Sequence, residues 1–406
     1  MNACVLTIGD ELLQGFTTDT NSAWLGTKLL PYGIIIQKKI TVGDDIISII
    51  NESQSIINDK YNYLFVTGGL GPTHDDITKE AFRQLMDDVM VFDESYYLKL
   101  KEKFEKWSIK MPEINRSQAM ILKNAEIIPN DNGSALGMYY YYKGTHIFIM
   151  PGVPREMKEM INNHIIPNFI KRLPQTKFIT IKTAGIMESK LAEKMSNLME
   201  KYSKSFSFAF LPHYSGVSLR IRKFGESGDI QKVKNVFYHE MRPYSYGIDE
   251  DTLEGILGGT LIDKKLTIAI AESCTGGLIG KRLTDTAGSS DYFLGSITTY
   301  SNKLKRSLLD VSEKTLNKNG AVSREVALEM ARGIRSKTNA DIGLSTTGIS
   351  GPDGATKNKP LGLVYIGLVT SNKSIVKKFN LDYGRHIHRE MTATAALNLT
   401  RKYIEE

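Results

Sequence analysis

The chain of 406 residues has little cysteine and no long hydrophobic run. Its only two cysteines, Cys4 and Cys274, lie in unrelated contexts, which argues against a disulfide framework or a cysteine zinc site and favours a reducing cytoplasm. No apolar stretch reaches the roughly 18 residues that a membrane-spanning helix needs. The N-terminus lacks the basic region of a signal peptide and starts with a strand-like run. We therefore expect a cytoplasmic protein without membrane association.

A cluster of basic residues is also absent. The 52 Lys and Arg residues exceed the 45 Asp and Glu residues by seven, but the two signs are interleaved along the chain and no basic tail occurs. A DNA-associated protein would need a concentrated basic face. The pattern instead favours a solvated, lysine-rich surface with some phosphate-binding positions, and we expect no nucleic-acid partner.

The sequence does contain two stretches of alternating strand and helix signals, over 1–170 and 251–406. Between them, residues 171–250 favour antiparallel pairing. Because one hydrophobic core rarely organises so long a chain, we predict an α/β protein with two three-layer α/β/α domains joined by a small α+β module. We also expect a charged helical hairpin near 94–110. The segment "HYSGVSLRI" in the module is interpreted as a packing and dimerisation surface of a homodimer, and not as a substrate lid.

The motif "LTIAIAESCTGGLIGKRL" at 266–283 places small polar residues and two glycines between a strand and a helix. Ser273 lies where a strand end exposes a hydroxyl, as nucleophiles do in α/β folds. Gly276 and Gly277 permit close approach of the backbone, so the amides of Thr275 to Gly277 can hold either an oxyanion or a phosphate. A simpler interpretation is that Ser273 or Thr275 only caps the helix.

Three further segments carry hydroxyls and cations at expected strand or helix ends. "TTYSNKLKR" contains Tyr300 and Lys305, "STTGISGPDG" is a second glycine turn with Thr347 and Gly348, and "YGRHIHRE" opens the last helix with Arg385. Because strand ends of an α/β sheet meet at one edge, these segments predict a pocket for a small phosphorylated ligand.

No Ser–His–Asp arrangement is evident, because His386 and His388 fall on an expected surface helix start. A lysine with a lowered pKa can activate a serine instead, and Lys305 with Tyr300 is the candidate couple. Cys274 is a rival nucleophile, but the first helical turn would bury it, which favours a structural cysteine.

The segments "AESCTGGLIGKRLTDTAGSSDYFLGSITTYSNKLK", "NGAVS" and "TTGISGPDGATKNKPLGLVY" resemble the C-terminal domain of the CinA family, a nicotinamide-nucleotide amidohydrolase, over about 252–406. The resemblance implies hydrolysis of nicotinamide mononucleotide to nicotinic acid mononucleotide and ammonia, in pyridine-nucleotide salvage, with no cofactor. It implies Ser273 as the nucleophile and Tyr300 with Lys305 as the activating pair. Thr347 and Arg385 match positions linked to substrate binding.

Two N-terminal motifs also follow expected strands, "TIGDELLQG" and "VTGGLGPTHDDITKEA". Gly68, Gly69 and Gly71 form a loop able to hold phosphate or a fused-ring ligand. Asp75 and Asp76 can hold a metal or act as a base, and they can equally be helix N-caps.

The segments "GDELLQG", "GGLGPTHDDITKE", "NRSQAMI" and "MPGVPREM" resemble the CinA N-terminal domain, related to the molybdopterin-binding MoaB/MogA fold, over residues 3–170. The resemblance implies hydrolysis of ADP-ribose to AMP and ribose 5-phosphate with a divalent metal, Mg²⁺ or Co²⁺. Two acidic positions of the molybdopterin proteins fall on Asp44 and Asp76, and Asp10, Asp44, Asp75 and Asp76 are the candidate ligands or bases. "GGLGPT" departs from the molybdopterin pattern "GGTG", which weakens a role in cofactor synthesis. A binding module without turnover and a competence-associated protein are the alternatives.

Overall fold

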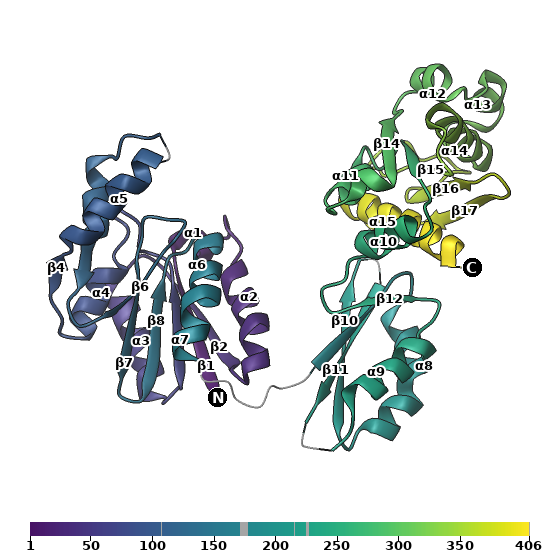
Figure 1. Ribbon diagram of the computed structural model, residues 1–406. Coiled ribbons are helices and arrows are strands. Elements are labelled where there is room, and N and C mark those ends of the chain that lie inside the picture. Colours follow the sequence, from purple (N-terminus) through teal and green to yellow (C-terminus); the bar gives the residue numbers. More distant parts are fainter. Residues whose placement is uncertain (107, 171–177, 215, 225–226, 406) are drawn as a thin grey trace. The chain divides into compact units, whose positions relative to one another are not determined.

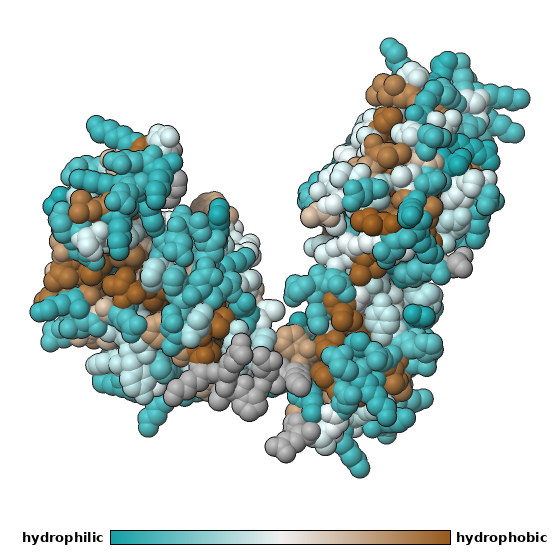
Figure 2. All heavy atoms as spheres, viewed as in Figure 1, coloured by the Kyte–Doolittle hydropathy of each residue, from teal (hydrophilic) through white to brown (hydrophobic). Residues whose placement is uncertain are grey.

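The computed structural model describes residues 1–106, 108–170, 178–214, 216–224 and 227–405. The chain forms two compact units, Met1–Thr176 and Lys177–Glu406 (Figure 1). On the face drawn in Figure 2, hydrophilic side chains cover most of the surface of each unit and surround separate hydrophobic patches. Among the helices of the described ranges, none is long and apolar enough to cross a membrane.

The first unit is built on a six-stranded mixed sheet. Its strands β2, β1, β3 and β8 run parallel, and β7 and β6 extend the sheet antiparallel. Buried strands with continuous apolar runs are typical of a sheet that is covered on both faces, and the "CVLTI" and "YLFVT" runs fit that pattern. In sheet order the strands are β2 (Ile35–Val42), β1 (Asn2–Ile8), β3 (Tyr63–Thr67), β8 (Thr145–Met150), β7 (Gly137–Tyr142) and β6 (Glu126–Ile128).

Helices cover both faces of this sheet, and side chains that alternate along β1 enter two different cores. Leu6 packs in one core with residues of α3 and α4, whereas Val5 packs in the other with residues of α2 and α6. The unit is therefore a three-layer α/β/α sandwich, as predicted. Its helices are α1 (Asp10–Leu13), α2 (Thr20–Leu29), α3 (Ile46–Asn58), α4 (Thr78–Leu85), α5 (Glu94–Lys106), α6 (Pro154–Met160) and α7 (Ile166–Phe169), with short turns at Leu30–Tyr32, Glu113–Ala119 and Ile161–Ile165 and a ribbon of β4 (Met90–Phe92) and β5 (Met120–Leu122).

The second unit begins with a four-stranded antiparallel sheet whose core receives side chains from two helices (Figure 1). Along "LRIR", the buried Leu219 and Ile221 alternate with the half-buried Arg220 and Arg222, a pattern typical of a sheet with one solvated face. The predicted antiparallel pairing of the middle module is confirmed. The strands in sheet order are β10 (Phe206–His213), β11 (Gly216–Lys223), β9 (Phe178–Thr183) and β12 (Ser245–Ile248), and the helices are α8 (Glu188–Tyr202) and α9 (Ile230–Glu240).

A second sheet in this unit has five strands. β14 and β15 lie parallel to β13 on its two sides, and β16 and β17 continue antiparallel from β15. One face packs on α10, α11 and α15 and the other on α12, α13 and α14, again in three layers. The strands are β14 (Phe293–Thr298), β13 (Ile268–Glu272), β15 (Ile342–Gly348), β16 (Leu363–Val369) and β17 (Ser374–Asn380); the helices are α10 (Leu253–Asp263), α11 (Leu278–Thr284), α12 (Asn302–Leu309), α13 (Glu313–Asn319), α14 (Arg324–Thr338) and α15 (Arg385–Glu405), with a turn at Ser289–Asp291.

One detail differs from the sequence predictions, and a second adds to them. The segment near 94–110 contains a single helix, α5, in its described residues, and not a helical hairpin. This helix remains ordered because Tyr96, Tyr97 and Leu100 pack in a small core of their own. Within "HYSGVSLRI", the side chains of Val217 and Leu219 enter the core of the module, so this part of the segment packs inward. The homodimer and the division at 170 and 250 stay predictions; residues 171–177 lie outside the described residues.

Candidate functional site

The C-terminal candidate site forms where β13 ends. Because β13, β14 and β15 are parallel, their carboxyl ends meet at one edge of the sheet. Ser273 follows β13 directly, and its backbone N–H donates to the carbonyl of Thr346 on β15 at 3.0 Å. Gly276 and Gly277 then take φ angles of 61° and 92°, a left-handed conformation that favours glycine and turns the chain into α11.

Ser273 and Lys305 make direct contact at this edge. The Lys305 Nζ on α12 lies 3.0 Å from the Ser273 Oγ, and it also donates to the carbonyls of Thr299 at 2.7 Å and Tyr300 at 3.3 Å. The two residues are 8% and 1% exposed. Burial disfavours the charged ammonium and lowers the pKa of Lys305 to about 8. An amine that loses its proton near neutral pH can accept the proton of an adjacent hydroxyl.

Tyr300 does not share this contact through its side chain. Its hydroxyl accepts a hydrogen bond from Arg385 at 3.1 Å, and Arg385 also donates to the carbonyl of Gly351 at 3.0 Å. Among the described residues, Arg385 is the only hydrogen-bond partner of that hydroxyl, and Tyr300 reaches Lys305 only through its backbone carbonyl. The expectation that the Tyr300 hydroxyl and Lys305 form a couple is therefore corrected: the hydroxyl and Arg385 instead lie together at the exposed mouth of the site.

Glu272 was not singled out from the sequence, yet it organises the turn. Its buried carboxylate accepts the backbone N–H groups of Gly277 at 2.9 Å and Gly280 at 2.9 Å, as well as the Ser296 hydroxyl at 2.9 Å and the Ile279 N–H at 3.2 Å. A carboxylate in this place satisfies amides that the first turn of a helix leaves unpaired and lies at the positive end of the helix dipole. The signal in the sequence was an acidic residue directly before the small residues of the turn.

This arrangement corrects the expected anion cradle. The Gly277 N–H is bound to Glu272, and the Gly276 N–H donates to the Ser273 carbonyl at 3.2 Å. Of the three amides from Thr275 to Gly277, only that of Thr275 has no acceptor among the described residues. One donor is left for an oxyanion, and not a row of three.

The threonines and the arginine of α15 fix the walls of the site. The Thr275 hydroxyl lies 2.8 Å from that of Thr346, and the Thr275 carbonyl accepts two bonds from Arg389, at 2.8 and 3.2 Å. The buried Thr347 hydroxyl donates to the carbonyl of Ala321 at 2.8 Å, which leaves its oxygen as an acceptor. Gly348 ends β15, and a Cβ added to this residue would lie 2.9 Å from the carbonyl oxygen of Leu363. The sequence places Arg389 beside Arg385 at the start of the last helix, and the structure adds that Arg389 positions the turn through the Thr275 carbonyl.

The Cys274 thiol and the His388 imidazole, the two alternative reactive groups, do not hydrogen-bond to the Ser273 hydroxyl. Cys274 is buried, and burial raises the pKa of its thiol to about 12, so the thiol stays protonated at neutral pH. His388 is also buried, and not on the surface as expected, because its Nδ1 lies 2.8 Å from the Ser350 hydroxyl inside the fold. Neither group has a hydrogen bond to the Ser273 hydroxyl among the described residues.

The N-terminal candidate site lies at the corresponding edge of the first sheet, where the parallel strands β1, β2, β3 and β8 end. Gly68 and Gly69 have φ angles of 114° and 62°. A Cβ on Gly68 would lie 2.2 Å from the Ile8 carbonyl oxygen, and one on Gly69 would lie 2.2 Å from the Thr78 hydroxyl. Only glycine therefore allows this turn to pack against the end of β1.

Two of the carboxylates at this edge form a pair, and a third, Asp76, holds the glycine loop. Asp10 and Asp44 bind each other's backbone, with the Asp10 N–H 3.0 Å from Asp44 Oδ2 and the Asp44 N–H 3.3 Å from Asp10 Oδ1. Burial raises the pKa of Asp44, and the nearby charges of Asp10 and Asp75 raise it further. Asp76 instead accepts the N–H of Gly71 at 2.6 Å and both the N–H and the hydroxyl of Thr73, at 2.9 and 2.5 Å.

The expected metal set of Asp10, Asp75 and Asp76 is not assembled. Within the described ranges, no group of three or more His, Cys, Asp or Glu side chains lies close enough to hold a metal ion. Asp76 holds the glycine loop and not the start of a helix: α4 begins after Ile77 with no side-chain cap, so the interpretation of the aspartates as helix N-caps is wrong. The Asp10–Asp44 pair fits a weaker form of metal binding that also needs the substrate, because Mg²⁺ is commonly held by one or two carboxylates together with substrate phosphates.

Known proteins resemble the chain over its whole length. Family models match residues 4–171 ("Probable molybdopterin binding domain"), 179–234 ("Damage-inducible protein CinA KH domain") and 250–404 ("CinA C-terminal domain"). The CinA-like protein of Chlorobaculum tepidum is 37% identical over 91% of this chain and 90% of its own length. The chain belongs to the CinA family. A second CinA-like protein, from Chloroherpeton thalassium, is 39% identical over 100% of this chain and 99% of its own.

Among solved structures, the competence/damage inducible protein CihA from Agrobacterium tumefaciens is 35% identical and covers 38% of this CinA chain and 98% of its own, with a TM-score of 0.36. The family models divide the CinA chain so that Ser273, Lys305 and Arg385 fall in the C-terminal match and Asp10 and Asp44 fall in the N-terminal match. Each candidate site therefore belongs to one family domain.

Proposed function

We propose that the C-terminal domain of this CinA protein is an amidohydrolase that converts nicotinamide mononucleotide to nicotinic acid mononucleotide and ammonia. The observation that carries the proposal is the 3.0 Å contact between the Ser273 hydroxyl and a buried lysine amine. The identity of the substrate comes from the resemblance of the C-terminal motifs, and the exposed Arg385 supplies a cation for the phosphate of a nucleotide.

In the proposed reaction, neutral Lys305 takes the proton of the Ser273 hydroxyl as the oxygen bonds to the amide carbon. The carbonyl oxygen becomes an oxyanion, which the Thr275 N–H can stabilise. The Lys305 ammonium then gives its proton to the amide nitrogen, the carbon–nitrogen bond breaks, and ammonia leaves an ester on Ser273. Water, deprotonated by Lys305, attacks this ester; the acid is released and the serine regains its proton.

Ammonia release from nicotinamide mononucleotide tests this proposal. We expect Ser273→Ala to lower kcat by about 10³-fold or more, because the nucleophile is removed. Cys274→Ala is the matched control, since it removes the neighbouring reactive group, and it should retain activity within about threefold. Full activity in Ser273→Ala, or loss only in Cys274→Ala, would refute the serine mechanism.

For the N-terminal domain we propose hydrolysis of ADP-ribose to AMP and ribose 5-phosphate with a divalent metal. The observation that favours it is the Asp10–Asp44 pair, in which burial and neighbouring negative charge raise the pKa of Asp44. Asp10 and Asp44 would hold a divalent cation that arrives with the substrate diphosphate. This cation would neutralise the negative charges of the two carboxylates and of the diphosphate. The glycine loop of Gly68 and Gly69 lets a ligand approach the backbone.

AMP formation from ADP-ribose with Mg²⁺ or Co²⁺ discriminates between the proposed functions of this domain. We expect AMP only when metal is present, and at least a roughly tenfold lower rate for Asp44→Asn. Binding of ADP-ribose without AMP formation would instead support a nucleotide-binding module. Tight DNA binding that weakens steeply with salt would support the competence-associated alternative.

A further inference from the structure

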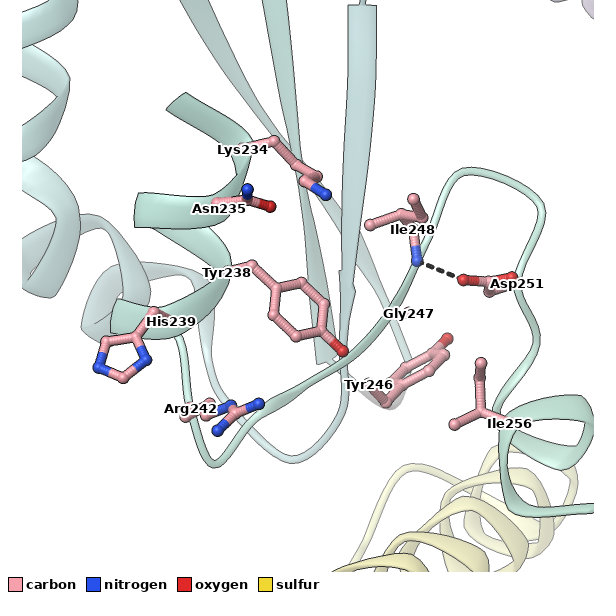
Figure 3. A pocket seen from close by; sticks show the side chains of 10 residues that line it. All are labelled: Lys234, Asn235, Tyr238, His239, Arg242, Tyr246, Gly247, Ile248, Asp251 and Ile256. Carbon is pink, nitrogen blue, oxygen red and sulfur yellow. Dashed lines mark hydrogen bonds between the residues drawn. The ribbon is translucent and has the colours of Figure 1, made fainter. Parts of the chain in front are cut away.

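A cavity of about 470 Å³ lies in the second unit, away from Ser273, between α9, β12 and the start of α10 (Figure 3). Its volume falls in the range of small-molecule sites. The walls come from two modules, because Lys234 and Tyr238 belong to α9 whereas Ile256 belongs to α10. None of its lining residues contributes to the reactions proposed above, so the cavity has no assigned role.

The cavity carries an excess of positive charge. Lys234 and Arg242 line it, and neither side chain has an acidic partner among the described residues. The only acidic lining residue, Asp251, already accepts the Ile248 N–H at 2.8 Å, which Figure 3 draws as a dashed line. His239 adds a further group that can donate to an anion. Unpaired cations around a hollow favour an anionic ligand, and phosphate is the anion that lysine and arginine bind best.

Two tyrosines supply an aromatic surface beside these cations. Tyr238 and Tyr246 are partly buried, and burial raises the pKa of both phenols. In the described part of the chain, neither ring stacks on another aromatic ring or lies under a cation. Each ring packs partly against a hydrophobic core, and the part that lines the cavity can contact a planar heterocycle. The side-chain amide of Asn235 on the same wall can donate to or accept from the edge of that heterocycle.

We propose that this cavity binds a nucleoside monophosphate, with the base against Tyr238 or Tyr246 and the phosphate between Lys234 and Arg242. Phosphate alone would use the cations but not the rings, and an apolar ligand would leave both cations desolvated without a partner. A single-stranded nucleic acid has the same two chemical groups, but a cavity of about 470 Å³ has the volume of a small-molecule site, which favours a single nucleotide. The proposal is independent of the two proposed reactions, because it uses none of their residues.

Calorimetric titration of the full-length protein with AMP tests the site. We expect the double variant Lys234→Ala/Arg242→Ala to lose about tenfold or more in affinity at one class of sites. Lys232→Ala is the matched control, because Lys232 is exposed on the same helix but does not line the cavity, and its affinity should stay within about twofold. Equal affinities of wild type and the double variant would overturn the proposal.

Photolabelling with 8-azidoadenosine monophosphate separates this cavity from AMP bound at the N-terminal site. The labelled peptide should contain Tyr238 or Tyr246, and labelling should disappear in the double variant but not in Lys232→Ala. Label confined to the N-terminal unit would overturn the proposal. Tyr238→Phe should retain and Tyr238→Leu should weaken AMP binding, since only the first keeps the ring. Equal affinity for inorganic phosphate, or tenfold tighter binding of a single-stranded oligonucleotide, would also overturn it.

Discussion

At the scale of single residues, the reactive property of the C-terminal site is the lowered pKa of Lys305. Below pH 8 the amine is mostly an ammonium, which cannot take the proton of Ser273; above it, the neutral base predominates. We therefore expect kcat/KM for nicotinamide mononucleotide to rise as the pH increases from 6.5 to 9, with an inflection at about 8. Initial rates of ammonia release between pH 6.5 and 9 measure this pH dependence of kcat/KM.

Lys305→Arg provides the control for the pH profile. A guanidinium does not lose its proton in this range, so the variant should show little activity at any pH. An unchanged inflection in Lys305→Arg would assign the titration to another group and contradict the role of the lysine. Lys305→Met tests whether loss of activity comes with loss of folding, because methionine is of similar length and uncharged.

At the scale of elements, the turn between β13 and α11 depends on the Glu272 carboxylate. Glu272→Gln replaces one acceptor oxygen by an NH2 donor, which then faces backbone N–H groups. We expect the free energy of unfolding to fall by about 1.5–3 kcal/mol. Ser296→Ala removes one of the four donors and should cost only about 0.5–1.5 kcal/mol. Urea denaturation measures the free energy of unfolding of both variants. Equal losses in Glu272→Gln and Ser296→Ala would contradict the role of the Glu272 carboxylate in holding the turn.

The turn between β3 and α4 depends on glycine for a steric reason. Gly68→Ala combines a positive φ with a Cβ 2.2 Å from the Ile8 carbonyl, so we expect a loss of roughly 3 kcal/mol or more. Gly144→Ala is the matched control: φ is 89°, but no atom lies within 4 Å of the added Cβ, so only the backbone strain of about 1–2 kcal/mol remains. Similar losses for the two variants would show that the close approach at Gly68 does not matter.

At the scale of the whole molecule, each candidate site lies in one compact unit with its own cores. In the full-length chain we therefore expect Ser273→Ala to leave the rate of ADP-ribose hydrolysis within about twofold, and Asp44→Asn to leave nicotinamide mononucleotide hydrolysis equally unaffected. Assays of both reactions on both variants check this. Loss of one activity after removal of the other site would show that the units depend on each other.

The sequence by itself determined the order of strands and helices, the positions of Ser273 and the glycines at strand ends, and the three-layer architecture. These features follow from local periodicity and from backbone conformations that only glycine adopts readily. Only the tertiary structure decided which polar groups pair. It placed the Tyr300 hydroxyl on Arg385, buried His388 against Ser350, and bound Arg389 to Thr275, 114 residues earlier in the chain. Such partners are chosen by packing between distant segments, because a buried polar group must take whichever donor or acceptor the fold brings within reach.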